Sequence, residues 1–146
     1  MFSLQWSEEF AVGVESIDRE HRALFDLFND LHRGILRGET QSLTAEKLVR
    51  LVQYTREHFA DEERLMAESG YPKLEEHRAS HRSLTVQVEA MMADLERSQA
   101  VMNLPALKFL NEWVTQHILK EDRAYIPWMR EIAGAQEKIS IVAAGD

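Results

Sequence analysis

The sequence predicts an all-α protein folded as an up-down-up-down antiparallel four-helix bundle with an N-terminal arm. Four stretches place apolar residues three and four positions apart, which is the spacing of a helix with one buried face. No stretch alternates between apolar and polar residues as a half-buried strand does, and short connections between long helices favour antiparallel neighbours. We therefore expect a single domain over residues 1–146, divided into an arm (1–17), a bundle (about 18–126) and a tail (127–146).

The first predicted helix extends from Asp18 to Arg37, and Gly38 follows the last apolar position as a helix-ending residue. The second extends from about Thr44 to Glu68, with Thr44 as the expected N-cap. The sequence Gly70-Tyr71-Pro72 then interrupts the helical pattern. Ahead of these helices, Trp6 is the expected anchor of the arm.

The third predicted helix extends from about Lys73 to Arg97. The fourth starts near Asn103 and Pro105, because a capping residue followed by a proline in the first turn is typical of a helix N-terminus. Pro127 disrupts the pattern of the fourth helix and marks its expected end.

The composition excludes several classes of protein and site. Asp and Glu number 25 against 17 Lys and Arg, a net charge of -8, which argues against nucleic-acid binding because phosphates require clustered cations. The absence of cysteine excludes disulfides, iron–sulfur clusters and thiol nucleophiles. We find neither a signal peptide nor an apolar run long enough to cross a membrane, so we expect a cytoplasmic protein.

The predicted buried faces carry histidines and carboxylates at positions where apolar residues would be expected. In chain order these residues are His21, His58, Glu62, His77, His81, His117 and Asp122. In an alternating bundle, the starts of the first and third helices meet the ends of the second and fourth, so all seven should converge in one layer. The sixth histidine, His32, lies about 16 Å along the first helix from His21, and we expect it to be a structural core residue.

A bound metal would remove the cost of burying this layer, which is about 1–3 kcal/mol for each unpaired group and more for a charge. Five imidazoles, two bridging carboxylates and a bridging hydroxide would fill all but one of the coordination positions of two octahedral ions. The open position would belong to the ion with fewer histidines, where one small ligand could bind. Imidazole and carboxylate ligands suit iron among several metals, so ligand type alone does not select it.

The spacing of the last two residues in the layer also predicts a distortion. His117 and Asp122 are five residues apart, which places them about 140° apart around a regular α-helix. Both can face the core only if the helix is irregular, so we expect a π-bulge or a loosened last turn at this point.

The segments that contain these residues resemble the hemerythrin family, especially its single-domain bacterial members. The resemblance extends from about Trp6 to Tyr125, and it rests on the combination of four segments. They are Ile17-Asp18-Arg19-Glu20-His21; His58-Phe59-Ala60-Asp61-Glu62-Glu63; Tyr71-Pro72 leading to His77-Arg78-Ala79-Ser80-His81; and Trp113 followed by His117-Ile118-Leu119-Lys120-Glu121-Asp122.

The resemblance implies a non-haem di-iron centre that binds dioxygen reversibly, in an oxygen carrier, store or sensor rather than an enzyme. By match, one iron would be held by His77, His81 and His117, the other, with the open position, by His21 and His58, and Glu62 and Asp122 would bridge them. Leu24, Phe59, Trp113 and Ile118 resemble the apolar dioxygen pocket of the family. Dioxygen is then the expected partner, and a protein that receives it from this chain is a further candidate.

Other metal proteins fit the sequence less well. A ferritin-like iron oxidase needs Glu-x-x-His pairs, and no histidine here has a glutamate three residues before it. The His-Glu-x-x-His motif of zinc hydrolases is also absent. A purely structural metal site is normally closed, whereas the ligand count leaves one position open. A di-iron enzyme that reduces peroxide or nitric oxide stays as the alternative, although it would need a proton donor near the open position.

Overall fold

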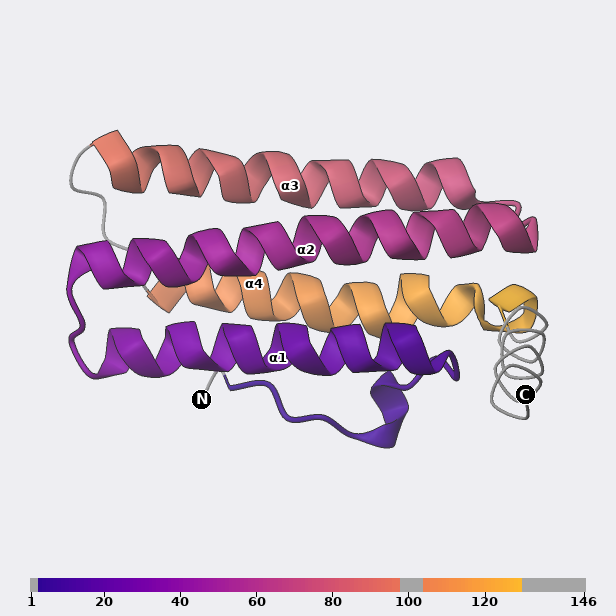
Figure 1. Ribbon diagram of the computed structural model, residues 1–146, viewed down its shortest axis with the longest axis horizontal. Helices are drawn as coiled ribbons and strands as arrows, with labels where there is room; N and C mark the ends of the chain where they lie inside the picture. The colour runs from indigo at the N-terminus through magenta and orange to yellow at the C-terminus, as the bar shows by residue number, and fades with distance from the viewer. Residues whose placement is uncertain (1–2, 98–103, 130–146) are drawn as a thin grey trace, which may run out of the picture.

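The computed structural model describes residues 3–97 and 104–129, and within them four long helices lie side by side (Figure 1). They are α1 (Glu15–Leu36), α2 (Gln41–Ser69), α3 (Leu74–Arg97) and α4 (Leu104–Gln116), which continues directly into a π-helical segment, η2 (His117–Asp122). Residues 126–129 add a further helical turn after η2. This arrangement confirms the predicted all-α antiparallel bundle.

The arm is shorter than expected, because α1 begins at Glu15, three residues before the predicted Asp18. Asp18 is buried in the first turn of α1, where its carboxylate oxygens accept hydrogen bonds from the backbone N–H groups of Val12 (2.8 Å) and Gly13 (3.3 Å). Asp18 therefore lies inside the helix, and its side chain binds the backbone of the arm to the first turn. The arm also contains a short 3₁₀ turn, η1 (Glu8–Phe10).

Trp6 anchors the arm, as predicted. Its ring centroid lies 5.6 Å from that of Phe25 on α1 and 6.0 Å from that of Phe10, and the Arg22 guanidinium lies 4.8 Å above the ring. These contacts hold the arm along the side of α1, where Figure 1 shows it.

The predicted N-cap of the second helix was wrong by one turn. Thr40, not Thr44, caps α2, because the Thr40 hydroxyl accepts the Leu43 backbone N–H at 3.2 Å. Thr44 lies inside the helix, and its hydroxyl donates to the Thr40 carbonyl at 3.0 Å. The helix ends at Gly70, whose φ of 72° is the left-handed conformation that glycine adopts without strain.

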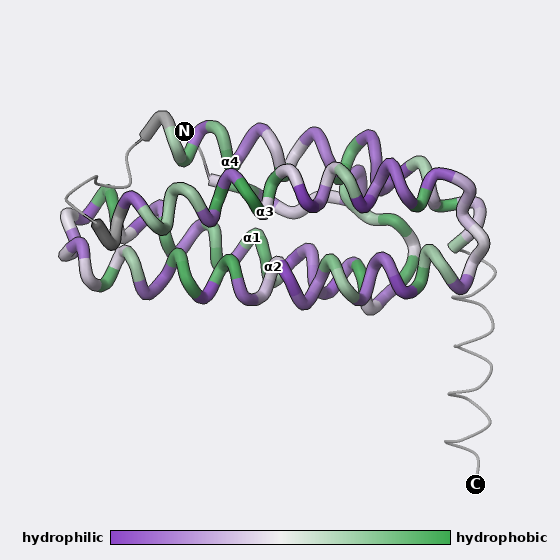
Figure 2. The backbone as a smooth tube through the Cα atoms, turned by 90° about the horizontal axis from the view of Figure 1, so that it is seen from above, coloured by the Kyte–Doolittle hydropathy of each residue, from purple (hydrophilic) through white to green (hydrophobic). Residues whose placement is uncertain are grey.

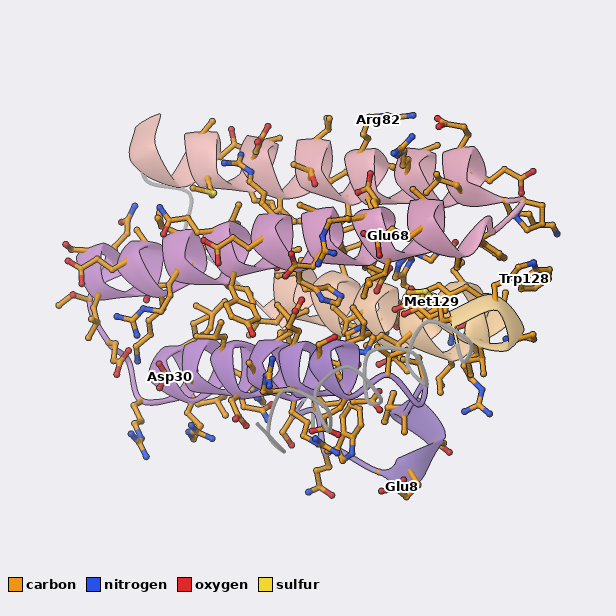
Figure 3. The ribbon with its side chains drawn as sticks, turned by 45° about the vertical axis from the view of Figure 1, so that its right-hand side comes forward. Glu8, Asp30, Glu68, Arg82, Trp128 and Met129 are labelled. Carbon is orange, nitrogen blue, oxygen red and sulfur yellow. The ribbon has the colours of Figure 1, made fainter. Side chains whose placement is uncertain are left out.

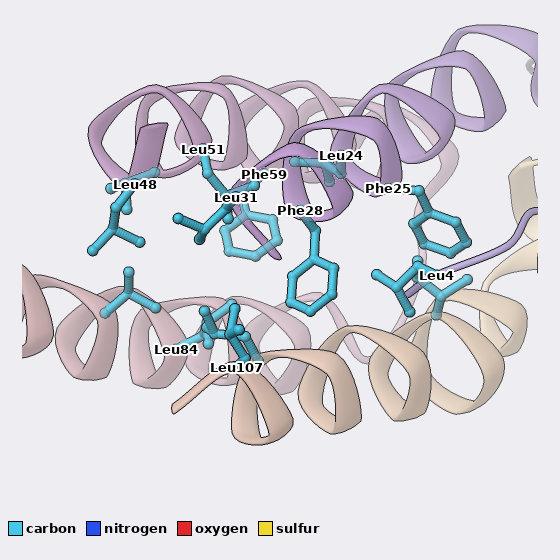
Figure 4. Packing of buried hydrophobic residues seen from close by; sticks show 14 of the residues in the cluster. Leu4, Leu24, Phe25, Phe28, Leu31, Leu48, Leu51, Phe59, Leu84 and Leu107 are labelled. Carbon is cyan, nitrogen blue, oxygen red and sulfur yellow. The ribbon is translucent and has the colours of Figure 1, made fainter. Parts of the chain in front are cut away.

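The described residues form two buried apolar clusters. The larger one joins the middle of the bundle to the arm; its labelled members in Figure 4 are Leu4, Leu24, Phe25, Phe28, Leu31, Leu48, Leu51, Phe59, Leu84 and Leu107. The smaller one lies at the other end and contains Val12, Val14, Ile17, Leu65, Met66, Tyr71, Tyr125 and Met129. Along the chain, the predicted polar residues of each of the four segments lie between a member of the first cluster and a member of the second. The polar layer therefore separates the two apolar clusters.

The tube in Figure 2 shows hydrophilic and hydrophobic residues alternating along every helix, as expected for helices with one buried face. Among the described residues, no helix combines the length and the apolar character needed to cross a bilayer.

Candidate metal centre

The structure brings together all seven side chains of the predicted layer. None of them is more than 5% exposed, and Glu62 and Asp122 are completely buried. Their metal-ligating atoms form two overlapping groups in which all atoms lie within 4.8 Å of one another. One group contains Glu62, His77, His81, His117 and Asp122, and the other contains His21, His58 and Glu62. His32 belongs to neither group; it is buried beside Phe28, away from the layer.

Glu62 lies between two sets of histidines and directs one oxygen towards each. Its Oε1 atom is 2.8 Å from Nε2 of His77 and 3.2 Å from Nε2 of His81. Its Oε2 atom is 3.2 Å from Nε2 of His58 and 3.6 Å from Nε2 of His21. This is the orientation of a carboxylate that bridges two cations.

Asp122 divides its oxygens in the same way. Its Oδ1 atom is 3.0 Å from Nε2 of His77 and 3.1 Å from Nε2 of His117, whereas Oδ2 is 3.2 Å from Nε2 of His21. The Nε2 atoms of His81 and His117 are themselves 3.0 Å apart. The inward-facing nitrogens thus gather around two points, one with three histidines and one with two.

The π-helical segment η2 explains how both His117 and Asp122 reach this layer. A π-helix pairs residue i with residue i+5, so two residues five apart lie on the same side of it. Both side chains are buried, which the regular α-helix of α4 could not achieve if it continued unchanged. The predicted local irregularity is confirmed.

Two members of the layer have buried polar atoms without hydrogen-bond partners. Both ring nitrogens of His21 and both carboxylate oxygens of Asp122 are in this position, despite the short distances given above. Unsatisfied buried groups of this kind normally have a structural explanation. A cation between them would use the inward-facing lone pairs, so the donor set fits a bound metal.

The protonation of the metal-free layer follows from its close packing. Burial alone would lower the pKa of His58, but hydrogen bonds to the Glu20 and Glu62 carboxylates raise it to about 10. Burial likewise opposes ionisation of Glu62, yet the surrounding histidines lower its pKa well below the ordinary value. Without a metal, the layer therefore holds protonated histidines beside ionised carboxylates, and a metal must displace those protons.

Sequence comparisons assign this centre to a family. A family model, described as the hemerythrin HHE cation binding domain, matches residues 12–129. The chain belongs to the hemerythrin family. It is 34% identical over 125 residues to a bacteriohemerythrin of Clostridium acetobutylicum, an alignment that covers 83% of this chain and 97% of the relative. It is 30% identical over 120 residues to a myohemerythrin of Riftia pachyptila, with 82% and 88% covered.

Solved structures agree with the sequence comparison. A crystal structure of wild-type hemerythrin aligns with a TM-score of 0.82 and 29% identity, covering 86% of this chain and 97% of the other. The likeness in fold therefore extends over most of this chain.

Three further carboxylates of this hemerythrin contact the outer nitrogens of the histidines, and the sequence analysis missed them. Glu20 is 2.8 Å from Nδ1 of His58, Glu63 is 3.0 Å from Nδ1 of His81, and Glu121 is 2.7 Å from Nδ1 of His117. Each carboxylate can accept the Nδ1 proton, which leaves Nε2 free to bind a metal. The available signal was that each of these glutamates is the sequence neighbour of a predicted ligand.

The four residues of the predicted pocket, Leu24, Phe59, Trp113 and Ile118, all line one cavity beside the layer. The cavity reaches His21 and His58 from the two-histidine group, together with His117 and Asp122. Its remaining lining is almost entirely apolar and continues away from the layer as Phe28, Leu51, Val52, Leu84, Val88, Leu110 and Val114, with Thr55, Arg56 and Thr85 as the other members.

Aromatic rings also fix two histidines of the layer on the cavity side. Phe59 stacks on His81 with centroids 3.7 Å apart, and Trp113 stacks on His117 at 4.4 Å. These contacts restrict the rotation of the imidazoles and keep their Nε2 atoms directed inward.

Proposed function

We propose that this hemerythrin binds dioxygen reversibly at a non-haem di-iron centre held by the polar layer. The observation that carries the proposal is the division of the Glu62 and Asp122 oxygens between two groups of histidines. When bound, two iron ions supply the pair of electrons that dioxygen takes up and recover it when dioxygen leaves.

In this proposal, His77, His81 and His117 hold one iron, His21 and His58 hold the other, and Glu62 and Asp122 bridge the two. The distances from Glu62 Oε1 and Asp122 Oδ1 to the three-histidine group, and from Oε2 and Oδ2 to the two-histidine group, support this assignment. The iron with two histidines keeps the open position. It is also the iron whose histidines both line the apolar cavity.

The cavity residues have a separate task in this proposal. Leu24, Phe59, Trp113 and Ile118 surround the open position and exclude water from it. Because water and protons promote the loss of bound oxygen in reduced form, an apolar wall favours its release as dioxygen. Binding without turnover follows from this exclusion.

The same wall argues against the enzymatic alternative, in which peroxide or nitric oxide is reduced. That chemistry needs a proton donor within hydrogen-bond reach of the bound substrate. The titratable side chains that line the cavity are Arg56, a permanently charged cation, and the proposed ligands themselves. We therefore favour a binding protein over an enzyme.

An absorption spectrum of the iron-loaded protein tests the proposal. We expect a charge-transfer band in the near-ultraviolet and visible range that forms in air, disappears when dioxygen is removed and returns on re-aeration. Metal analysis of the same sample should give two irons per chain. A single iron per chain, or tightly held zinc that iron cannot replace, would contradict the di-iron assignment.

A further inference from the structure

The three outer carboxylates reach their histidines in different ways. Glu121 follows His117 by four residues in the same segment, so the two are neighbours along the chain. Glu63 lies on α2 and contacts His81 on α3, so this contact spans two helices. Glu20 also contacts a histidine of another helix, but its side chain is 13% exposed, against 25% for that of Glu63. Glu63 thus combines a contact between helices with access of water to its carboxylate, and its position needs further support.

Arg78 on α3 supplies this support. Its Nε atom donates to Oε1 of Glu63 at 3.2 Å, while Oε2 of Glu63 lies 3.0 Å from Nδ1 of His81. The two oxygens of one carboxylate therefore contact two residues of α3 that are about one turn apart. Arg78 is held in turn by Glu75, whose Oε1 atom accepts a hydrogen bond from Nη1 at 2.5 Å. A guanidinium presents its donors in a rigid fork, so it can hold both carboxylates at once.

This support distinguishes Glu63 from the other two outer carboxylates. In residues 3–97 and 104–129, neither Glu20 nor Glu121 has a lysine or arginine nitrogen within 4.0 Å, whereas Glu63 has Arg78. The pair is half-exposed, with 35% of the Arg78 side chain accessible, so its direct contribution to stability is small. What it determines is where the Glu63 carboxylate lies.

We propose that Arg78 is a positioning residue for the iron with three histidines, and that it acts by holding Glu63 against His81. This proposal rests on the proposed function, because it takes His81 as an iron ligand. A carboxylate that accepts the Nδ1 proton makes an imidazole a stronger electron donor at Nε2. A stronger donor stabilises ferric iron more than ferrous iron. Arg78 therefore strengthens iron binding and lowers the reduction potential of the centre.

The charge of Arg78 acts in the opposite direction to its positioning role. A guanidinium near a bound cation repels it, and it repels ferric iron more than ferrous iron. If only this repulsion mattered, removing the charge would strengthen iron binding and lower the reduction potential. Loss of positioning would weaken iron binding and raise the potential. The sign of the change therefore decides between the two roles.

The test measures two properties of the iron-loaded full chain without dioxygen: iron retention against a competing chelator, and the reduction potential from a redox titration. For Arg78→Gln we expect about tenfold weaker iron binding, at the lower end of the effect of residues that support metal ligands. The reduction potential should rise, by about 59 mV for each tenfold by which ferric binding weakens more than ferrous binding. Arg78→Lys keeps the charge but not the fork, and both properties should change in the same direction.

Two further variants show whether Arg78 acts through Glu63. Glu63→Gln should weaken iron binding by itself, and adding Arg78→Gln to it should have no further effect, because the shared contact is already lost. Arg82→Gln is the matched control for charge. Arg82 follows His81 on the same helix, but it is exposed and projects away from the bundle in Figure 3. This variant should keep the parental iron binding and potential.

Three results would overturn the role of Arg78. They are tighter iron binding or a lower potential in Arg78→Gln, parental values in Arg78→Lys, and effects of Arg78→Gln and Glu63→Gln that simply add. Circular dichroism of each variant checks that it is folded, and Arg78→Lys decides the question alone if Arg78→Gln is not. A parent that takes up fewer than two irons, or whose iron cannot be oxidised and reduced, contradicts the proposed function itself.

Discussion

Removal of iron should lower the melting temperature of this protein substantially. In the metal-free layer, both ring nitrogens of His21 and both oxygens of Asp122 are buried without hydrogen-bond partners. Each such group costs about 1–3 kcal/mol. A ligand present at about 1,000 times its dissociation constant stabilises the folded state by about 4 kcal/mol. With about 2–4 °C per kcal/mol for a domain of this size, the expected shift is about 8–16 °C.

The assay is thermal unfolding followed by circular dichroism, with and without iron, at one pH. His117→Ala removes a proposed ligand and should lose most of the iron-dependent shift. His32→Ala is the matched control, because His32 is equally buried but lies outside the layer. It should melt lower in both states and keep the full shift. Equal melting temperatures for the metal-free and iron-loaded parent would refute the idea that the metal satisfies the layer.

Three further predictions concern the surroundings of the iron. Leu24→Ala and Ile118→Ala should speed the decay of the oxygenated spectrum while iron content stays at two per chain; decay at the parental rate would place the protective wall elsewhere. Glu121→Gln should weaken iron binding about 10- to 100-fold, measured by chelator competition, because the amide holds the Nδ1 proton of His117 less firmly. In the metal-free protein, the raised pKa of His58, about 10, contributes stability that is complete below pH 6.5 and disappears as the pH rises through 10. Urea unfolding of the metal-free protein should therefore show declining stability from neutral to alkaline pH, and a rise over that range would contradict the assigned ion pairs.

The layer could be predicted from the sequence because its histidines and carboxylates occupy positions on the helices where the pattern calls for apolar residues. A histidine such as His77 on an apolar helical face is visible without a structure, and helix direction alone brings the four faces together at one end. The π-helical segment was also predictable, since the five-residue separation of His117 and Asp122 does not fit an α-helix. These inferences need only periodicity and topology.

The outer carboxylates and the start of α1 were not predictable in the same way. Glu63 lies on a half-exposed part of α2, where a glutamate is common. Only its 3.0 Å contact with Nδ1 of His81 on α3 shows that it supports a proposed ligand. Asp18 was predicted to begin the first helix, which is the start of the apolar pattern. Its carboxylate instead binds the arm from inside the first turn. Both cases depend on contacts between elements, which periodicity does not encode.

The position of the polar layer between two apolar clusters links stability to function. Both clusters border the layer, so unpaired polar groups in the layer weaken the packing of both ends of the bundle. Tyr125 belongs to the smaller cluster and also donates to Glu62, and Ile118 belongs to the larger cluster and also lines the cavity. The side chains that stabilise the bundle are thus the same ones that surround the centre. A mutation chosen to open the oxygen pocket, such as Ile118→Ala, should consequently also loosen the larger cluster.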